Sequence, residues 1–262
     1  DETSDQAVKI SSVGRRTGSF RCSNELLNKF FANVLRSQED NFVDVPTDCP
    51  QRCERFAWTG DAQVFSETAM MNYDVRGFFR KWIADLNYLA EHSGGMFTVI
   101  APYHTQLSPK REKGGAGSAG WSDAGVVCPW MYYRKYGDRA VLERSVELIE
   151  MYVDLQDSVP TPPTIGDHLA LGKKKTDCSF VSEALRIEMM RLAVLADKAL
   201  GREEKARHFE DRRAARLKEF HAKWFDEKGE LEERTQTSAA FTIVYGLAPS
   251  QAALKNAGRL LV

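Results

Sequence analysis

The chain has 262 residues, of which 43% are hydrophobic and 28% are charged, proportions that are ordinary for a globular protein. Its formal net charge of −1 gives no electrostatic reason to expect binding to nucleic acid or to an anionic membrane surface. No run of 18 apolar residues occurs, so the sequence predicts no segment that crosses a bilayer.

The cysteines are odd in number and are found at Cys22, Cys49, Cys53, Cys128 and Cys178. Two of them lie four residues apart, but neither a second cysteine pair nor a histidine pair completes a zinc site. We therefore expect free, mostly buried thiols, with no metal and no cofactor. The first residues do not form a signal peptide, although they could follow a removed one. The sequence does not determine the cellular location of the protein, and secretion or the periplasm is favoured over the cytoplasm.

The N-terminal part of the chain predicts an extended segment followed by a helix. Residues 7–21 mix apolar side chains with glycines, which indicates a lead-in that could pair with a preceding β-domain. Ser23 is a good N-cap for the helix that follows. The apolar residues of this helix recur at helical spacing, at Leu26, Leu27, Phe30, Phe31, Val34 and Leu35.

Helical periodicity returns further along the chain, at 62–72, 75–92, 121–136, 139–157, 178–200, 203–226, 235–247 and 249–262. The intervening loop 93–120 is too long for a simple connector and suggests a functional loop. In 203–226 an apolar stripe is accompanied by mixed charges, which predict a solvated outer face. About nine helices with almost no strands suit an all-α fold in which helical hairpins form a ring.

The turn-rich segment from Asp44 to Asp61 carries the strongest chemical signal. Pro46, Pro50 and Gly60 disfavour a regular helix through its first half. Carboxylates beside an aromatic face are what a sugar site requires: one acid protonates the leaving oxygen, others bind hydroxyls, and an indole covers the apolar face of a pyranose. The segment supplies these groups at Asp48, Arg52, Glu54, Arg55, Trp58 and Asp61.

The local pattern Asp-Cys-Pro-Gln-Arg-x-Glu-Arg-x-x-Trp-Thr-Gly-Asp-Ala, which begins at Asp48, resembles the signature of the α-L-rhamnosidases of glycoside hydrolase family 78. The likeness runs from about Gly18 to the last residue. Further segments keep the family's order, at Phe78–Leu86, Gly120–Ala124, Pro129-Trp130, Tyr136–Asp138 and Gly166–Leu169, the last being similar to a Gly-Asp-Trp-Leu loop.

The resemblance implies an (α/α)6 barrel of the six-hairpin glycosidase type with twelve helices. Because the chain supplies fewer and stops inside an amphipathic segment, we expect 23–262 to be about the N-terminal two-thirds of a catalytic domain. Residues 1–22 would be the extended linker from a preceding β-domain. The implied reaction removes terminal α-L-rhamnose with inversion, using an acid and a base whose carboxyl groups lie roughly 6.5–9.5 Å apart.

The resemblance also implies roles for individual residues. Glu54 is the expected general acid, and the expected substrate-binding residues are Asp48, Trp58, Asp61, Trp121 and His168. The neighbouring aromatic side chains favour the protonated form of Glu54, whereas Arg52 and Arg55 would favour its charged form if they pair with it. The alternative is that Glu54 makes only surface ion pairs.

Other readings stay open for several of these residues. Asp61 and Asp48 could serve only as helix or turn caps. Trp58 and Trp121 could belong to the core, and His168 could simply face solvent. Asp123 could face the same cleft or cap the helix that begins at 124.

The sequence departs from the family pattern at three places. Cys53 stands where aspartate is usual, and His168 stands where tryptophan is usual. The site could therefore bind a different sugar or aglycone. The family's general base lies in a Gly-Ala-Thr-Thr-x-Trp-Glu segment that does not occur here. Glu230, Glu232 and Glu233 lack that context, so we leave the base unassigned and expect the fragment alone to be inactive.

Two further functions therefore compete with the rhamnosidase interpretation. One is a helical-barrel glycosidase for another sugar, and the other is a degenerate carbohydrate-binding domain that lacks the base. In each case the expected partner is a carbohydrate, with no nucleic acid and no membrane. We also expect association through apolar surface near the end of the chain, at Leu254, Leu260 and Leu261.

Overall fold

Helices account for nearly all the regular structure of the computed structural model, which describes residues 8–103, 116–170 and 174–261. Two strands of two residues each pair as a small antiparallel hairpin after the first helix. The described elements are α1 (Glu25–Asn41), β1 (Phe42–Val43), β2 (Val45–Pro46), α2 (Thr59–Asn72), α3 (Arg76–His92), α4 (Ala124–Tyr136), α5 (Arg139–Asp157), α6 (Cys178–Leu200), α7 (Glu203–Trp224), α8 (Gln236–Val244) and α9 (Gln251–Arg259).

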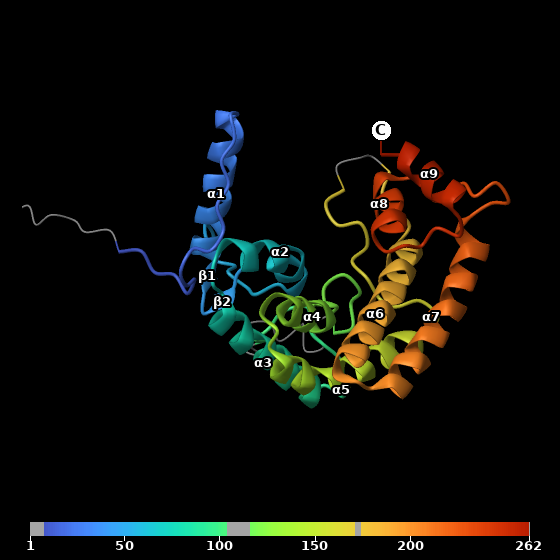
Figure 1. Ribbon diagram of the computed structural model, residues 1–262, viewed down its shortest axis with the longest axis horizontal. Coiled ribbons are helices and arrows are strands. Elements are labelled where there is room, and N and C mark those ends of the chain that lie inside the picture. Colours follow the sequence, from blue (N-terminus) through green and yellow to red (C-terminus); the bar gives the residue numbers. More distant parts are fainter. Residues whose placement is uncertain (1–7, 104–115, 171–173, 262) are drawn as a thin grey trace, which may run out of the picture.

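The helices follow an open arc, with α1 at one end and α8 and α9 at the other (Figure 1). Along the arc α4 packs against α2, α3 and α5, and α6 packs against α5 and α7. This arrangement confirms the predicted all-α fold of helical hairpins. No helix in the described ranges is long and apolar enough to span a bilayer.

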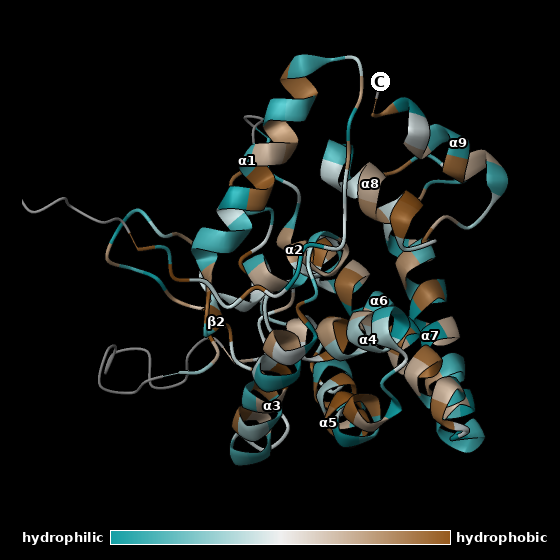
Figure 2. Cartoon of the chain, turned by 60° about the vertical axis from the view of Figure 1, so that its left-hand side comes forward, coloured by the Kyte–Doolittle hydropathy of each residue, from teal (hydrophilic) through white to brown (hydrophobic). Residues whose placement is uncertain are grey.

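The two larger hydrophobic clusters hold the arc together. The larger one joins α2 to α6 and includes the fully buried rings of Phe79, Trp82, Tyr132 and Tyr152. The smaller one joins α6 and α7 to the C-terminal helices through residues such as Phe220. Hydrophilic residues colour much of the outward side of α3 and α7 (Figure 2), so each helix buries one stripe, as the periodicity predicts.

Helix α1 differs from its prediction in two respects. Its N-cap is Asn24 and not Ser23, because the Asn24 side chain accepts hydrogen bonds from the backbone N–H groups of Leu26 and Leu27. The N-terminal half of the expected apolar stripe is also uncovered, with Leu26 74% and Phe30 66% exposed, whereas Leu35 is buried. The reason is that α1 stands away from the remaining helices (Figure 1), so its apolar residues have little to pack against.

The extended lead-in lies against the ends of the first two helices. Arg16 forms a β-bridge with Tyr73, and the backbone N–H of Ser12 donates to the carbonyl of Phe42 over 2.7 Å. The described part of the lead-in is therefore held by backbone bonds to this domain itself. Of the predicted loop 93–120, residues 104–115 lie outside the described residues.

Three smaller expectations are corrected by the side-chain packing. The cysteines are free, but only Cys49 and Cys128 are buried. On α7 the expected solvated face is partly covered, because Arg212 and Arg216 turn inward to pair with Asp157 at the end of α5.

The C-terminal leucines also divide between packed and open positions. Leu260 packs against the smaller cluster, whereas Leu261 is exposed and Leu254 is half-buried. Helix α1, by contrast, carries three exposed apolar side chains, Leu26, Leu27 and Phe30.

Candidate active site

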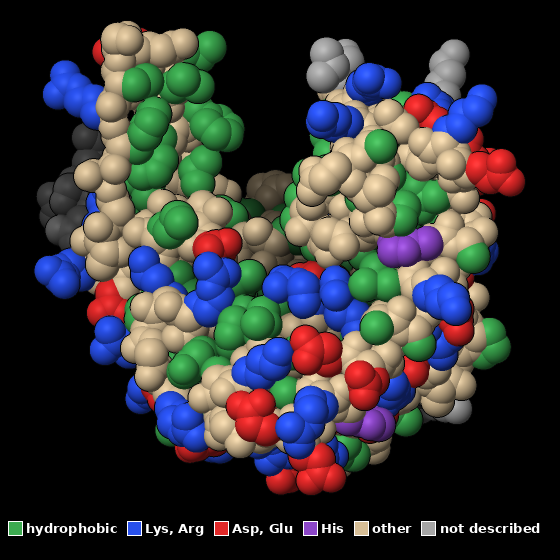
Figure 3. Space-filling model, turned by 45° about the vertical axis from the view of Figure 1, so that its right-hand side comes forward, with side chains coloured by type: hydrophobic (Ala, Val, Ile, Leu, Met, Phe, Trp, Pro, Cys, Tyr) green, Lys and Arg blue, Asp and Glu red, His purple; other side chains and the backbone are tan. Residues whose placement is uncertain are grey.

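A cavity of about 680 Å³ lies between the N-terminus of α2 and helix α8. Segments 119–121 and 165–169 and part of α6 complete its lining. The space-filling view shows the molecule hollowed between two arms (Figure 3). All six residues that the sequence nominated line this one cavity, namely Asp48, Glu54, Trp58, Asp61, Trp121 and His168.

The turn-rich segment is closed by hydrogen bonds that fix its acids. The backbone N–H of Asp48 donates to the carbonyl of Phe56 over 2.9 Å, and Asp48 Oδ1 accepts from the N–H of Phe56 over 3.1 Å. Arg55 adopts a left-handed φ of 48° within this turn. A bridge between Trp58 and Ile100 then anchors the segment beside the start of α2. Asp48 is thus held by backbone contacts before any ligand arrives.

Both oxygens of Glu54 have partners inside the segment. Trp58 Nε1–H donates to Oε1 over 3.0 Å, and Arg52 Nη2 lies 2.5 Å from Oε2. The same Nη2 lies 3.6 Å from Asp48 Oδ2, so one guanidinium spans two acids. Arg52 is thus the arginine that pairs with Glu54, and it does so within the cavity lining. Trp58 combines a hydrogen bond to the acid with a place in the cavity wall.

Asp61 is the third residue of α2 and not its N-cap, a position that Trp58 occupies. A carboxylate in the first turn is favourable beside the positive end of the helix dipole. Burial is the main cause that raises the pKa of Asp61, and the negative charges of Asp48 and Glu54 raise it further. A backbone hydrogen bond of Asp61 itself and the nearby His168 act in the opposite direction. Asp61 therefore interacts electrostatically with the other two acids of the cavity.

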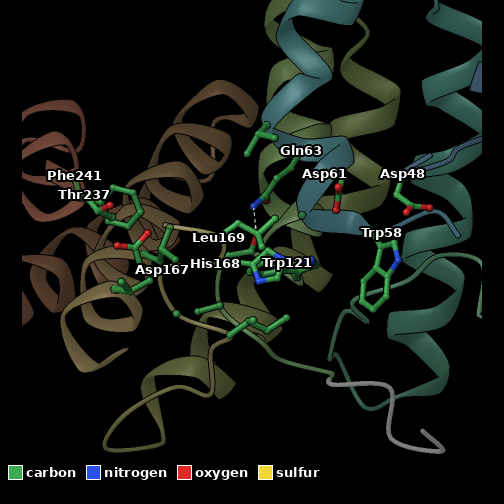
Figure 4. Close-up of a pocket in the computed structure, with 18 of the residues that line it drawn as sticks. Asp48, Trp58, Asp61, Gln63, Trp121, Asp167, His168, Leu169, Thr237 and Phe241 are labelled. Atoms are coloured by element: carbon green, nitrogen blue, oxygen red, sulfur yellow. Dashed lines mark hydrogen bonds between the residues drawn. The ribbon is translucent and has the colours of Figure 1, made fainter. Parts of the chain in front are cut away.

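Trp121 lies directly on the start of α2. A Cβ atom at Gly60 would lie 2.7 Å from Trp121 Nε1, so only glycine permits this close approach. His168 meets the indole edge to face, with the ring centroids 5.4 Å apart. Although His168 is exposed, it is held against Trp121 and does not merely face solvent. Figure 4 shows these two rings between the acids of the α2 side and Phe241 of α8.

Asp123 is buried and is not among the residues that line this cavity. Its two carboxylate oxygens accept hydrogen bonds from the backbone N–H of Gly120 and from the Tyr152 hydroxyl, each over 2.7 Å. Burial raises the pKa of Asp123 to about 6. Its side chain therefore holds the turn that carries Trp121. It does not face the cleft, and although Asp123 is at the N-cap position of α4, its side chain makes no capping hydrogen bond.

The wall opposite the acids was not predicted from the sequence. Helix α8 with its C-cap residue contributes Thr237, Phe241 and Tyr245, and the 165–169 segment contributes Ile165 and Leu169. Leu169 is 79% exposed and has a left-handed φ of 57°. The three α8 residues recur every four positions, which places them on one helix face. That spacing was the available signal, but it does not show which face meets a cavity.

One group among the described residues has the composition of a metal site. Ligand atoms of Asp48, Cys49 and Glu54 all lie within 4.8 Å of one another. Arg52 already places a positive charge on both carboxylates, which offsets the need for a cation there. Glu230, Glu232 and Glu233, which the sequence left without a role, are not among the residues lining the cavity.

Comparisons with known proteins all find α-L-rhamnosidases. A family described as the bacterial α-L-rhamnosidase six-hairpin glycosidase domain matches residues 15–262. An α-L-rhamnosidase of Alteromonas sp. is 33% identical over 252 residues, which cover 88% of this chain and 26% of the relative. One of Streptomyces avermitilis is 32% identical over 250 residues, covering 94% of this chain and 23% of the relative. The chain thus spans about a quarter of the length of these curated relatives.

Solved structures give the same result for the fold. The crystal structure of the Streptomyces avermitilis α-L-rhamnosidase complexed with L-rhamnose matches with a TM-score of 0.84 at 32% identity, covering 94% of this chain and 23% of that one. The native enzyme from Aspergillus terreus matches with a TM-score of 0.80 at 29% identity, covering 95% and 30% of the two chains.

Proposed function

Because the chain belongs to the family of bacterial α-L-rhamnosidase six-hairpin glycosidase domains, we propose that it carries the acid half of a site that hydrolyses terminal α-L-rhamnosides. In this proposal Glu54 protonates the leaving oxygen. The observation that carries it is the convergence of Glu54 with Asp48, Asp61 and two indoles on one cavity. Protein groups of this kind supply the proton donor, the hydroxyl ligands and the apolar wall that a glycosidase needs.

The contacts of Glu54 suggest how its proton is managed. Trp58 fixes Oε1, which leaves Oε2 as the oxygen that can carry and release a proton. Arg52 now holds Oε2 by an ion pair, which must open before that oxygen can pass a proton to a glycosidic oxygen. The Arg52 side chain is 61% exposed and can therefore swing away when a glycosidic oxygen arrives.

Asp48 and Asp61 are the proposed ligands of sugar hydroxyls. Hydrogen bonds from hydroxyls to carboxylates are short and strong, and they orient the ring relative to the acid. Rhamnose carries a methyl group where most hexoses carry a 6-hydroxyl. Trp58 and Trp121 offer apolar faces for that methyl and for the ring, with His168 beside them.

We further propose that the reaction inverts the anomeric centre. Inversion needs a second carboxylate that activates water from the opposite face of the ring. No residue of this chain is assigned to that role. The domain would then require a base from elsewhere in the protein, which is why activity is to be measured on the full-length protein.

The test compares Glu54→Gln with Asp48→Asn and Asp61→Asn on two substrates, an aryl rhamnoside with an acidic phenol and a rhamnose disaccharide. General acid catalysis contributes about 10²–10⁴-fold, so Glu54→Gln should lose that much kcat/KM on the disaccharide. It should lose far less on the aryl rhamnoside, because an acidic phenol leaves without protonation. The two asparagine variants should lose similar factors on both substrates.

Two results would decide against this account. Equal losses on both substrates for Glu54→Gln would remove it from the acid role. If the wild-type protein binds rhamnose tightly but cleaves neither rhamnoside, the carbohydrate-binding alternative is favoured.

A further inference from the structure

The Cys49 thiol lies behind the acids and links them without lining the cavity. Its side chain is buried, with 7% of the residue exposed. Cys49 Sγ–H donates to Asp48 Oδ2 over 2.8 Å, and Arg52 Nε–H donates to the same sulfur over 3.2 Å. Arg52 in turn reaches Glu54. One sulfur therefore joins a proposed sugar ligand to the guanidinium that holds the proposed acid.

We propose that Cys49 is a positioning residue that keeps Arg52 off Asp48 and in reach of Glu54. The inference rests on the proposed function, because it concerns the same acids. The thiol acts as a spacer: with it in place, Arg52 Nη2 lies 3.6 Å from Asp48 Oδ2, beyond a good hydrogen bond, but only 2.5 Å from Glu54 Oε2.

Of the groups around the thiol, Arg52 has the greatest freedom to move. Asp48 is fixed on its other oxygen by the backbone N–H of Phe56, whereas Arg52 is largely exposed. Without the sulfur, the guanidinium can close onto Asp48 as a two-point ion pair, the arrangement that arginine and carboxylate prefer. That collapse would occupy the lone pairs that Asp48 offers to the sugar and would therefore weaken sugar binding.

Serine at this position preserves the arrangement, while alanine does not. A hydroxyl can donate to Asp48 and accept from Arg52 in the same way as the thiol. Cys53, four residues further on and exposed, supplies a matched control within the same segment. Its replacement by alanine removes a thiol that none of these contacts uses.

The experiment is a double-mutant cycle in the full-length protein, with kcat and KM measured on an aryl rhamnoside. Residues in one hydrogen-bond network couple strongly, so Cys49→Ala should raise KM and lower kcat/KM by on the order of ten-fold. Cys49→Ser and Cys53→Ala should stay within about three-fold of wild type, a range that small context effects cover. In an Arg52→Ala background, Cys49→Ala should add almost nothing, because no guanidinium remains to collapse.

Several outcomes would overturn the proposal. Wild-type kinetics for Cys49→Ala would contradict it. So would a loss of activity that persists unchanged in the Arg52→Ala background, because that pattern indicates a packing defect. Failure of serine to restore activity, with the melting temperature unchanged, would also count against it. If wild type does not cleave the rhamnoside, the proposed function fails and the role of Cys49 fails with it. If wild type cleaves it and Cys49→Ala is silent, only the role of Cys49 fails.

Discussion

At the scale of single residues, Gly60 decides whether an indole can lie on the start of α2. Adding one methyl group there forces Trp121 outward, because the new carbon would meet the indole ring at 2.7–2.8 Å. Gly60→Ala should lower kcat/KM on rhamnosides by on the order of 10²-fold, since misplacing a binding group by about 1 Å can cost that much. The melting temperature should change little, because the indole can swing towards solvent.

Gly77 provides the control for that substitution. It lies in α3, and a Cβ atom there would meet nothing within 4 Å. Gly77→Ala should leave the kinetics unchanged and stabilise the helix by roughly 0.5–1 kcal/mol. Steady-state kinetics together with thermal melts check both variants. Wild-type kinetics for Gly60→Ala would mean that the position of Trp121 is unimportant.

The candidate site could be predicted from sequence at the level of residue identity but not of contact. The acids, Trp58, Trp121 and His168 were all found by pattern, and all line the cavity. The pattern could not show that Asp123 turns away to bond Gly120 and Tyr152. It also could not reveal the thiol of Cys49 between two charged groups, because a hydrogen bond depends on distances that the spacing does not encode.

At the scale of the elements, Asp123 connects the start of α4 to Tyr152 of α5. Burial raises its pKa from the usual 3.8 of an aspartate to about 6. The folded state therefore binds the proton more tightly than the unfolded state, and ionisation of Asp123 penalises folding. Its penalty is full above pH 6 and disappears as the pH falls below about 4, which follows from the two pKa values.

The free energy of unfolding should show this dependence when wild type is compared with Asp123→Asn. The difference should shift in favour of wild type by up to about 3 kcal/mol between pH 7 and pH 4, from two pKa units at 1.36 kcal/mol each. Denaturant unfolding across this pH range measures it. A difference that is constant with pH would show that the carboxyl does not titrate in this window.

The sequence predicted the helices better than it predicted their surroundings. Helices 139–157 and 178–200 begin and end where periodicity placed them. For α1 the periodicity correctly identified an apolar face, yet the N-terminal half of that face is exposed. Periodicity reports which face is apolar but not whether a neighbour covers it. Burial is a property of tertiary arrangement.

At the scale of the whole molecule, the apolar face of α1 should make the isolated chain associate. Leu26, Leu27 and Phe30 are exposed together along one helix, and contiguous apolar surface of this kind promotes contact between molecules. Sedimentation velocity should show association that increases with concentration. Phe30→Glu should reduce it, while Tyr88→Glu, which changes an exposed ring on α3, should not. A chain that stays monomeric at all concentrations would contradict this expectation.

The closing of the cavity is a property of the whole arc. Its walls come from residues near 48, 121, 168 and 241, which are distant in sequence and meet only because the helices curve round. The resemblance to a helical barrel made the ring predictable. Local pattern alone did not show that α8 would present Phe241 and Tyr245 to the acids.

The central claim is that this cavity receives rhamnose with Glu54 beside the leaving oxygen. A crystal structure of the full-length protein with L-rhamnose tests it most directly. We predict sugar hydroxyls within hydrogen-bond distance of Asp48 and Asp61, an indole against the ring, and Glu54 on the side of the anomeric carbon. Rhamnose bound elsewhere, or a Glu54 that points away from the anomeric carbon, would contradict the account.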